Sequence, residues 1–347
     1  MVPCVPDASA GDGPSARQRR VALGSVSPLG IPELREAIVG RERAVSKSAF
    51  VGKANVAVTE GSANAVGAAL RHCSARGYRK AVCGAPVPLR IRKSMASAGF
   101  AVKALPLAYE EDDWFVLHRA CGDRAVIYLS LPDDPTGAVA TAGYLSMLAG
   151  FAASHDVVLV YDARLDAFRF TADSCPTPVD LAVSASNVVV VNSLAENYGG
   201  TGDRVGWIVA HEAVVDGLAH QPGWAANRVS LSDQLAAVRV LGEGNDAVTA
   251  EVRNGRAAYQ ARVAGHRILD VPLPGGGSRL WLDLGVRDVD SLAKYARIEH
   301  QLVLTTSSGY APPEPGHILF PTGVPVHRLC EGVDKLERVL AGWGDGP

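Results

Sequence analysis

Short apolar runs rich in β-branched residues alternate with segments of helical periodicity along the chain up to about residue 229. Runs of this kind, bounded by turn residues, predict strands of a mostly parallel sheet that helices cover on both faces. Helical spacing of apolar residues predicts helices over 63–75 and 141–154, and Pro32 favours the start of an earlier helix. The seven predicted strands are 56–59, 80–83, 102–105, 125–129, 157–161, 188–191 and 207–210.

The pattern changes from about residue 230 and predicts a smaller α+β unit. We therefore expect a flexible leader over 1–20, a large α/β domain over 21–229 and a small C-terminal α+β domain over 230–347. The elements predicted for the small domain are a helical stretch 231–262, a Pro/Gly turn 272–277, strand 280–284, helix 289–300, strands 302–305 and 317–320, and helix 332–341.

Composition excludes some classes of partner. The chain has 347 residues, 48% hydrophobic content and a formal net charge of -2, with no long basic stripe, so nucleic acid is not expected as a partner. Arg19-Arg20 and the run from Arg90 to Lys93 are interpreted as solvated faces. The six cysteines lack CxxC spacing, which argues against a metal site or a disulfide framework and favours a reducing cytoplasm. No apolar run fits a signal peptide or a membrane span, so no membrane contact is expected.

Five segments, in the same order, resemble the class I/II aminotransferases, a fold-type I group that depends on pyridoxal phosphate (PLP). The resemblance implies an aminotransferase-like α/β fold and an active site formed between two subunits of a homodimer. The segments are 28–37, similar to the family's entry helix PxGxxxLRxA; 59–65, similar to its phosphate-binding turn; 133–137, similar to its NPTG box; 161–162, similar to its pyridine aspartate; and 193–206, similar to its lysine loop.

One end of the family's cofactor site is retained. Gly61, Ser62 and Ala63 follow a predicted strand and open a predicted helix, where backbone N–H groups and the helix dipole favour a phosphate or another dianion. The resemblance implies that Ser193 and Arg204 close the same cup. The alternative is an ordinary strand-to-helix turn with good capping residues.

Asp162 stands at the end of a predicted strand and matches the carboxylate that keeps the pyridine nitrogen of the cofactor protonated. That role makes sense only if PLP enters the site. The alternative is a strand-end carboxylate that pairs with an arginine, either Arg164 or Arg204.

The other end of the site departs from the family. Glu196 stands where the family has the lysine that forms an imine with PLP, and a carboxylate cannot form that bond. No lysine lies between Lys103 and Lys294. Asp134 replaces the asparagine that hydrogen-bonds the ring hydroxyl. Four further departures are Leu165 for a tyrosine on the ring hydroxyl, Pro88 for a stacking aromatic, Val26 for a tyrosine that reaches the partner subunit, and Leu319 for the arginine on the substrate carboxylate.

Glu196 has three interpretations. It is an inert replacement, a new general acid/base, or a structural partner for a nearby arginine. Carboxylates in apolar clefts can move protons near neutral pH, and with Asp134 in the same cleft two carboxylates could divide the acid and base roles.

Three functional hypotheses follow. The first is a bacterial biosynthetic enzyme that performs a condensation, cyclisation, elimination or isomerisation on an anionic, amino-acid-derived small molecule, with Glu196 and Asp134 as catalytic groups. The second is an enzyme that binds PLP, or its amine form pyridoxamine phosphate (PMP), without a covalent link, through Gly61, Ser62, Ala63, Asp162, Ser193 and Arg204. The third is an inactive dimerisation partner of another aminotransferase.

Overall fold

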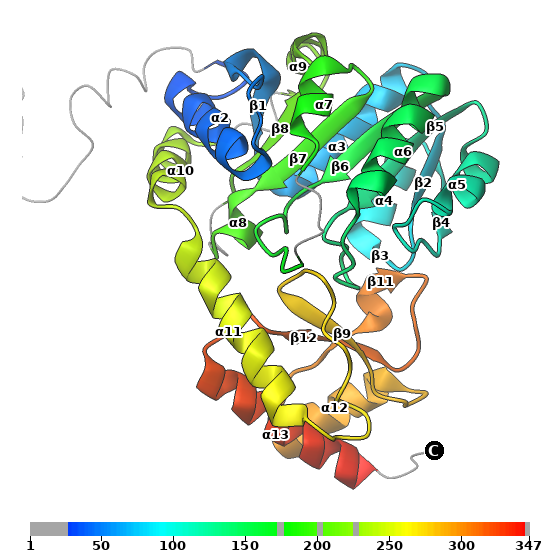
Figure 1. The fold of residues 1–347 in the computed structure, drawn as a ribbon, viewed down its shortest axis with the longest axis vertical. Helices are drawn as coiled ribbons and strands as arrows, with labels where there is room; N and C mark the ends of the chain where they lie inside the picture. Colours follow the sequence, from blue (N-terminus) through cyan, green and yellow to red (C-terminus); the bar gives the residue numbers. More distant parts are fainter. Residues whose placement is uncertain (1–26, 172–176, 200–203, 225–228, 344–347) are drawn as a thin grey trace, which may run out of the picture.

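A seven-stranded sheet forms the centre of the molecule (Figure 1). The computed structural model describes residues 27–171, 177–199, 204–224 and 229–343, so the predicted leader lies outside the described residues. The strand order is β1-β8-β7-β6-β5-β2-β4, and β8 is antiparallel to both of its neighbours while the other pairs are parallel. The mostly parallel seven-stranded sheet is therefore confirmed. The strands are β1 Val56–Thr59, β2 Lys80–Gly84, β4 Ala101–Leu105, β5 Arg124–Ser130, β6 Asp156–Asp162, β7 Val188–Ser193 and β8 Gly206–Ala210.

Helices cover both faces of this sheet, which explains why its strands are apolar on both sides. In β7, Val188 and Val190 face one core cluster while Val189 and Val191 face the other, as the alternation of side chains along a strand requires. The first face is covered by α2 Pro32–Ser46, α5 Asp113–Cys121, α6 Ala142–Ser154, α7 Val179–Ser184 and α10 Leu231–Glu243; the second by α3 Gly61–Ala75, α4 Leu89–Ser97 and α9 Glu212–Ala219.

The C-terminal part has a core cluster of its own and lies below the sheet in the view of Figure 1. Its three-stranded antiparallel sheet has the order β10-β12-β9. A short ladder between β11 and β3 Val87–Pro88 joins this part to the large sheet unit. The remaining elements are α11 Asp246–Val263, β9 Arg279–Asp283, α12 Val289–His300, β10 Thr305–Thr306, β11 Tyr310–Ala311, β12 His317–Pro321 and α13 Val326–Trp343. The domain boundary at residue 229 stays a prediction, since α10 still packs in the first core cluster.

Three C-terminal predictions differ from the structure. The stretch 231–262 is broken into α10 and α11 at Gly244, whose φ of 79° suits glycine and ends the first helix. Residues 302–304 are not a strand; Val303 is 78% exposed there. Helix α13 begins at Val326, directly after Pro325, because proline suits a helix start. Neither α13 nor another helix in the described ranges is long and apolar enough to span a membrane.

Candidate functional site

The turn between β1 and α3 forms the anion-binding end of the candidate site. Gly61 has a φ of 76°, a conformation that side chains disfavour. Gly206, in the adjacent strand β8, has no room for a side chain: a Cβ atom would lie 2.5 Å from the carbonyl carbon of Gly61. Glu60, at the N-cap position of α3, makes no side-chain capping bond. The first N–H groups of α3 are thus left without a side-chain cap and can receive an anion.

A cavity of about 240 Å³ lies at this turn. It brings together six of the eight predicted site residues, from the start of α3, the end of β7, the short helix α8 Leu194–Asn197 and the loop before β8. We call this cavity the cup; it is lined by Glu60, Gly61, Ser62, Ala63, Arg90, Ser193, Ala195, Glu196 and Arg204. The predicted convergence of Gly61, Ser62, Ala63, Ser193, Glu196 and Arg204 is therefore seen, while Asp134 and Asp162 do not line the cup.

Charges of both signs lie in the cup. Arg204 Nε is 2.8 Å from Glu60 Oε1, and both side chains are solvent-accessible, at 68% and 39% exposure. The Ser193 hydroxyl donates a hydrogen bond of 2.6 Å to Glu196 Oε2. An exposed ion pair in water is weak, so an incoming anion can compete with Glu60 for Arg204.

Outside the lining of the cup, but close enough to interact electrostatically with Glu196, Arg164 bridges the two remaining predicted site residues. Its Nη2 atom lies 2.6 Å from Asp134 Oδ2 and its Nη1 atom lies 3.3 Å from Asp162 Oδ2. The three side chains are 1%, 2% and 0% exposed. We call this buried group of Arg164, Asp134 and Asp162 the floor. Of the two arginines considered as partners of Asp162, it is Arg164 that pairs with it.

Two tyrosines complete the floor. The Tyr128 hydroxyl donates to Asp162 Oδ2 at 2.7 Å, and the Tyr310 hydroxyl donates to Asp134 Oδ1 at 2.8 Å. Both oxygens of Asp134 therefore have partners within the protein. Asp134 lies in this buried group and outside the lining of the cup, and its predicted catalytic role stays a prediction.

The two carboxyls of the floor differ in pKa. Burial raises the pKa of Asp162, and the guanidinium of Arg164 and the Tyr128 hydroxyl only partly oppose this effect. For Asp134, burial is outweighed by Arg164 and Arg279, so its pKa is lowered. Burial would lower the pKa of Arg164, but Asp162 and Asp134 raise it well above the usual value. Arg164 is thus held as a cation by Asp162 and Asp134 together.

The other departures from the family pattern are built into the packing. Leu165 is buried in a small cluster with Phe168 and Val252. Pro88 pairs with Tyr310 in the β3–β11 ladder, and Leu319 is a buried residue of β12. Val26 lies outside the described residues. Leu165 and Leu319 thus supply apolar packing at positions where the resembled family has polar side chains.

Sequence reasoning does not find two contributors, Arg90 and Tyr310, and finds only part of the role of a third, Arg164. The sequence predicts a solvated face for Arg90; its side chain is exposed but also lines the cup. The sequence indicates Arg164 as a partner of Asp162, two positions before it, but not its pairing with Asp134. Nothing in the sequence indicates Tyr310, since it is 176 residues away from Asp134 and reaches it only through the β3–β11 ladder.

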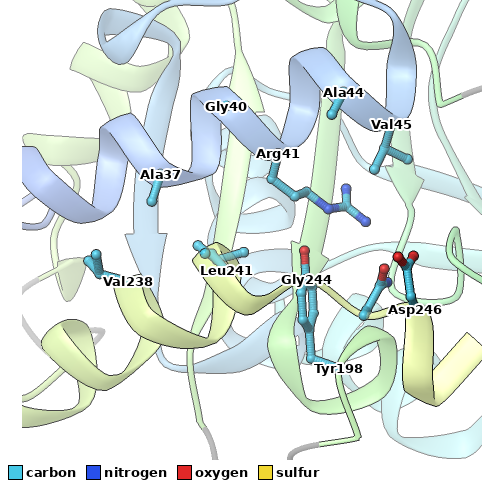
Figure 2. Close-up of a pocket in the computed structure, with 12 residues that line it drawn as sticks. Ala37, Gly40, Arg41, Ala44, Val45, Tyr198, Val238, Leu241, Gly244 and Asp246 are labelled. Atoms are coloured by element: carbon cyan, nitrogen blue, oxygen red, sulfur yellow. The ribbon is translucent and has the colours of Figure 1, made fainter.

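A second, larger hollow of about 610 Å³ lies between α2 and α10 (Figure 2). None of the predicted site residues lines it. Its arginine, Arg41, is buried and is paired with Asp166 and with Glu42, which also accepts a hydrogen bond of 2.8 Å from Trp207 Nε1. The charge of Arg41 is therefore neutralised inside the protein, and most of the lining is apolar or glycine.

Comparison with known proteins agrees with the fold. The family model "Aminotransferase class I and II" matches residues 5–263. The chain is 34% identical over 322 residues to the 3-methylarginine biosynthesis aminotransferase ArgM of Streptomyces arginensis, covering 89% of this chain and 83% of that protein. It is 26% identical over 324 residues to the L-aspartate:5-guanidino-3-methyl-2-oxopentanoate transaminase of Pseudomonas syringae pv. syringae, covering 91% and 82%. The crystal structure of aspartate aminotransferase from Thermotoga maritima superposes with a TM-score of 0.81 at 20% identity, covering 96% and 91%.

Proposed function

This chain belongs to the class I and II aminotransferase family, and on that premise we propose that it is a biosynthetic enzyme for a small amino or oxo acid that carries a guanidino group. Two relatives support the substrate class, since one is named for 3-methylarginine biosynthesis and the other for a 5-guanidino-2-oxo acid. The reaction that we propose is acid/base chemistry at Glu196, such as condensation, cyclisation, elimination or isomerisation.

The observation that carries this proposal is the combination of charges in the cup. The start of α3, Arg204 and Arg90 suit the carboxylate or another acidic group of a ligand. Glu60 suits its guanidinium, because a guanidinium group matches a carboxylate in a planar, bidentate geometry. A guanidino acid has both groups on one short chain.

The family depends on PLP, and the described residues fit only one end of that cofactor. The start of α3, Ser193 and Arg204 suit its phosphate. Asp162, which would face the pyridine nitrogen, is already paired with Arg164 and Tyr128, and Asp134 with Arg164 and Tyr310. The ring end does not fit as the side chains are arranged, so no step of the proposed reaction passes through PLP.

Glu196 is the proposed proton-transfer group. Ser193 binds Oε2 and orients the carboxylate, which leaves Oε1 to face a ligand proton. Arg204 and the start of α3 would hold the acid group of the ligand and fix the position of the reacting carbon. The floor would keep its own charges paired and stay outside the reaction.

A second candidate is an aminotransferase-like enzyme that holds PLP or PMP without a covalent link. Family membership and the names of both relatives favour it over the first candidate, while the pairing of Arg164 favours the first. Its binding residues would be those of the cup together with Asp162. The predicted homodimer, and the alternative of an inactive dimerisation partner, stay predictions.

The test uses purified full-length protein and isothermal titration calorimetry. L-Arginine and its 2-oxo acid are expected to bind, and L-norleucine, which lacks the guanidino group, is the matched control and is expected to bind much more weakly. Incubation with each ligand that binds, followed by mass spectrometry, reports conversion. Glu196→Gln is expected to slow that conversion about 100-fold or more while retaining phosphate binding.

Two results would contradict the proposal. Binding of norleucine as tight as that of arginine would remove the guanidino substrate class. Full turnover by Glu196→Gln would remove Glu196 as the proton-transfer group. Conversion that appears only after PLP or PMP is added would establish the second candidate.

A further inference from the structure

We propose that Arg164 is a specificity-determining residue of the candidate site: its guanidinium takes up both floor carboxylates, so the cup accepts a small anion but excludes a cationic aromatic ring. This inference deepens the proposed function and rests on it for the location of the site. It concerns which ligands enter, and it is independent of the reaction that Glu196 performs.

The local backbone positions Arg164 for this role. It lies two residues after Asp162, at the start of the turn 164–167 that follows β6, and its own backbone N–H donates to Asp162 Oδ1 at 3.2 Å. Asp134 follows the end of β5, the parallel neighbour of β6, so the two carboxylates meet at one edge of the sheet. A planar guanidinium can reach both at once, at 2.6 Å and 3.3 Å.

The two carboxylates of the floor are already balanced by two arginines, so neither is left to pair with a cation from a ligand. Asp134 and Asp162 carry two negative charges when ionised, and Arg164 with Arg279, which lies 3.7 Å from Asp134, supplies two positive charges. A pyridinium ring placed against Asp162 would add a third positive charge to a buried site. Because burial of an unpaired charge is strongly unfavourable, the ring could enter only if Arg164 left.

The spare donors of Arg164 indicate which ligand group suits the site instead. Its Nε atom is buried and lacks a hydrogen-bond partner among the described residues, and its Nη1 atom, although 3.3 Å from Asp162 Oδ2 as an ion pair, makes no hydrogen bond there either. Buried N–H donors without an acceptor are costly, and an oxygen atom of an anionic ligand can satisfy them, whereas the face of an aromatic ring cannot do so equally well. The floor is thus suited to extend the anion preference of the cup.

The experiment compares two probes that share the phosphate and differ in the ring: PMP and inorganic phosphate. Affinities are measured by calorimetry on the purified full chain. For the wild-type protein we expect the two dissociation constants to agree within about threefold, because the ring contributes no net binding. Wild-type binding of PMP at least tenfold tighter than of phosphate would overturn the proposal, and this measurement needs no variant.

The gain-of-binding variant is Arg164→Leu combined with Asp134→Asn. The pair removes one charge of each sign, restores the asparagine of the family pattern, and frees Asp162 for a ring cation. We expect this variant to bind PMP at least tenfold more tightly than phosphate. Asp134→Asn alone is the matched control: it keeps Arg164 and should show no preference for PMP.

The remaining outcomes are decisive as well. A double variant with a wild-type circular dichroism spectrum and no preference for PMP would overturn the role of Arg164. If the double variant does not fold, the wild-type comparison decides. Arg164→Lys, which keeps the positive charge on a shorter side chain, should then show a partial increase in affinity for PMP relative to phosphate. Failure of arginine to bind would contradict the substrate class and would leave the ratio of PMP to phosphate unchanged, so the two proposals fail separately.

Discussion

The cup and the floor both pair arginine with carboxylates, yet burial gives the two pairs opposite properties. Arg204 and Glu60 are 68% and 39% exposed, and such pairs contribute about 0–1 kcal/mol, so a ligand can separate them. Arg164 and its two aspartates are at most 2% exposed, and removing one partner of such a group costs about 3–5 kcal/mol. The cup can therefore exchange its partner for a ligand, whereas the floor keeps the partner that the chain supplies.

The largest expected effect is on the floor. Arg164→Leu leaves Asp134 and Asp162 buried without their cation, so we expect the free energy of unfolding to fall by about 3–5 kcal/mol. Denaturant unfolding followed by circular dichroism measures this loss. The double change with Asp134→Asn should recover part of it; equal losses in the single and double variants would show that charge pairing is not the cause.

The next largest effect on stability is expected at Asp133, which precedes Asp134 in the chain but forms no ion pair with an arginine among the described residues. Burial raises its pKa to about 6, and hydrogen bonds donated by Thr136 and Tyr109 only partly oppose this. Because this folded-state pKa lies above the unfolded value of 3.8, the stability due to Asp133 is full below pH 3.8 and is lost as pH rises to about 6. The expected size is on the order of 3 kcal/mol.

Asp133→Asn tests this pH dependence. The variant should gain stability relative to the wild type as pH rises from about 4 to about 6 and keep a constant advantage above that. Unfolding curves at several pH values measure the difference. A difference that does not vary over this window would show that Asp133 ionises normally.

A smaller loss of stability is expected from a substitution in β8 next to the glycine turn of the cup. In Gly206→Ala the new Cβ would lie 2.5 Å from the carbonyl carbon of Gly61, so the turn must shift. We expect a loss of about 1–3 kcal/mol in stability and weaker phosphate binding. Gly150→Ala in α6 is the matched control, since its Cβ meets nothing within 4 Å, and it should not lower stability.

The smallest effect on stability is expected at Arg204. Arg204→Ala should change the free energy of unfolding by less than about 1 kcal/mol, while phosphate affinity falls about tenfold through loss of a charge-assisted hydrogen bond. Arg262→Ala, which removes an exposed arginine from its pair with Asp334, is the control. An equal loss of phosphate affinity in both variants would indicate a general charge effect.

The sequence predicts the sheet and the cup because both depend on local patterns. Apolar runs between turn residues identify the seven strands, and the glycine turn before a helix identifies the anion end. The floor is harder to predict from the sequence, because the partners of Asp134 are Arg164, 30 residues away, and Tyr310, 176 residues away. The apolar run 302–304 also shows that β propensity alone does not make a strand, which needs a neighbour to pair with.

The ladder between β3 and β11 has a mechanical consequence for the molecule. It pairs Tyr310 with Pro88, and the same tyrosine donates its hydroxyl proton to Asp134. Any swing of the C-terminal part away from the central sheet would have to break both the ladder and this bond. Any such displacement would therefore disturb the ionic network of the floor as well.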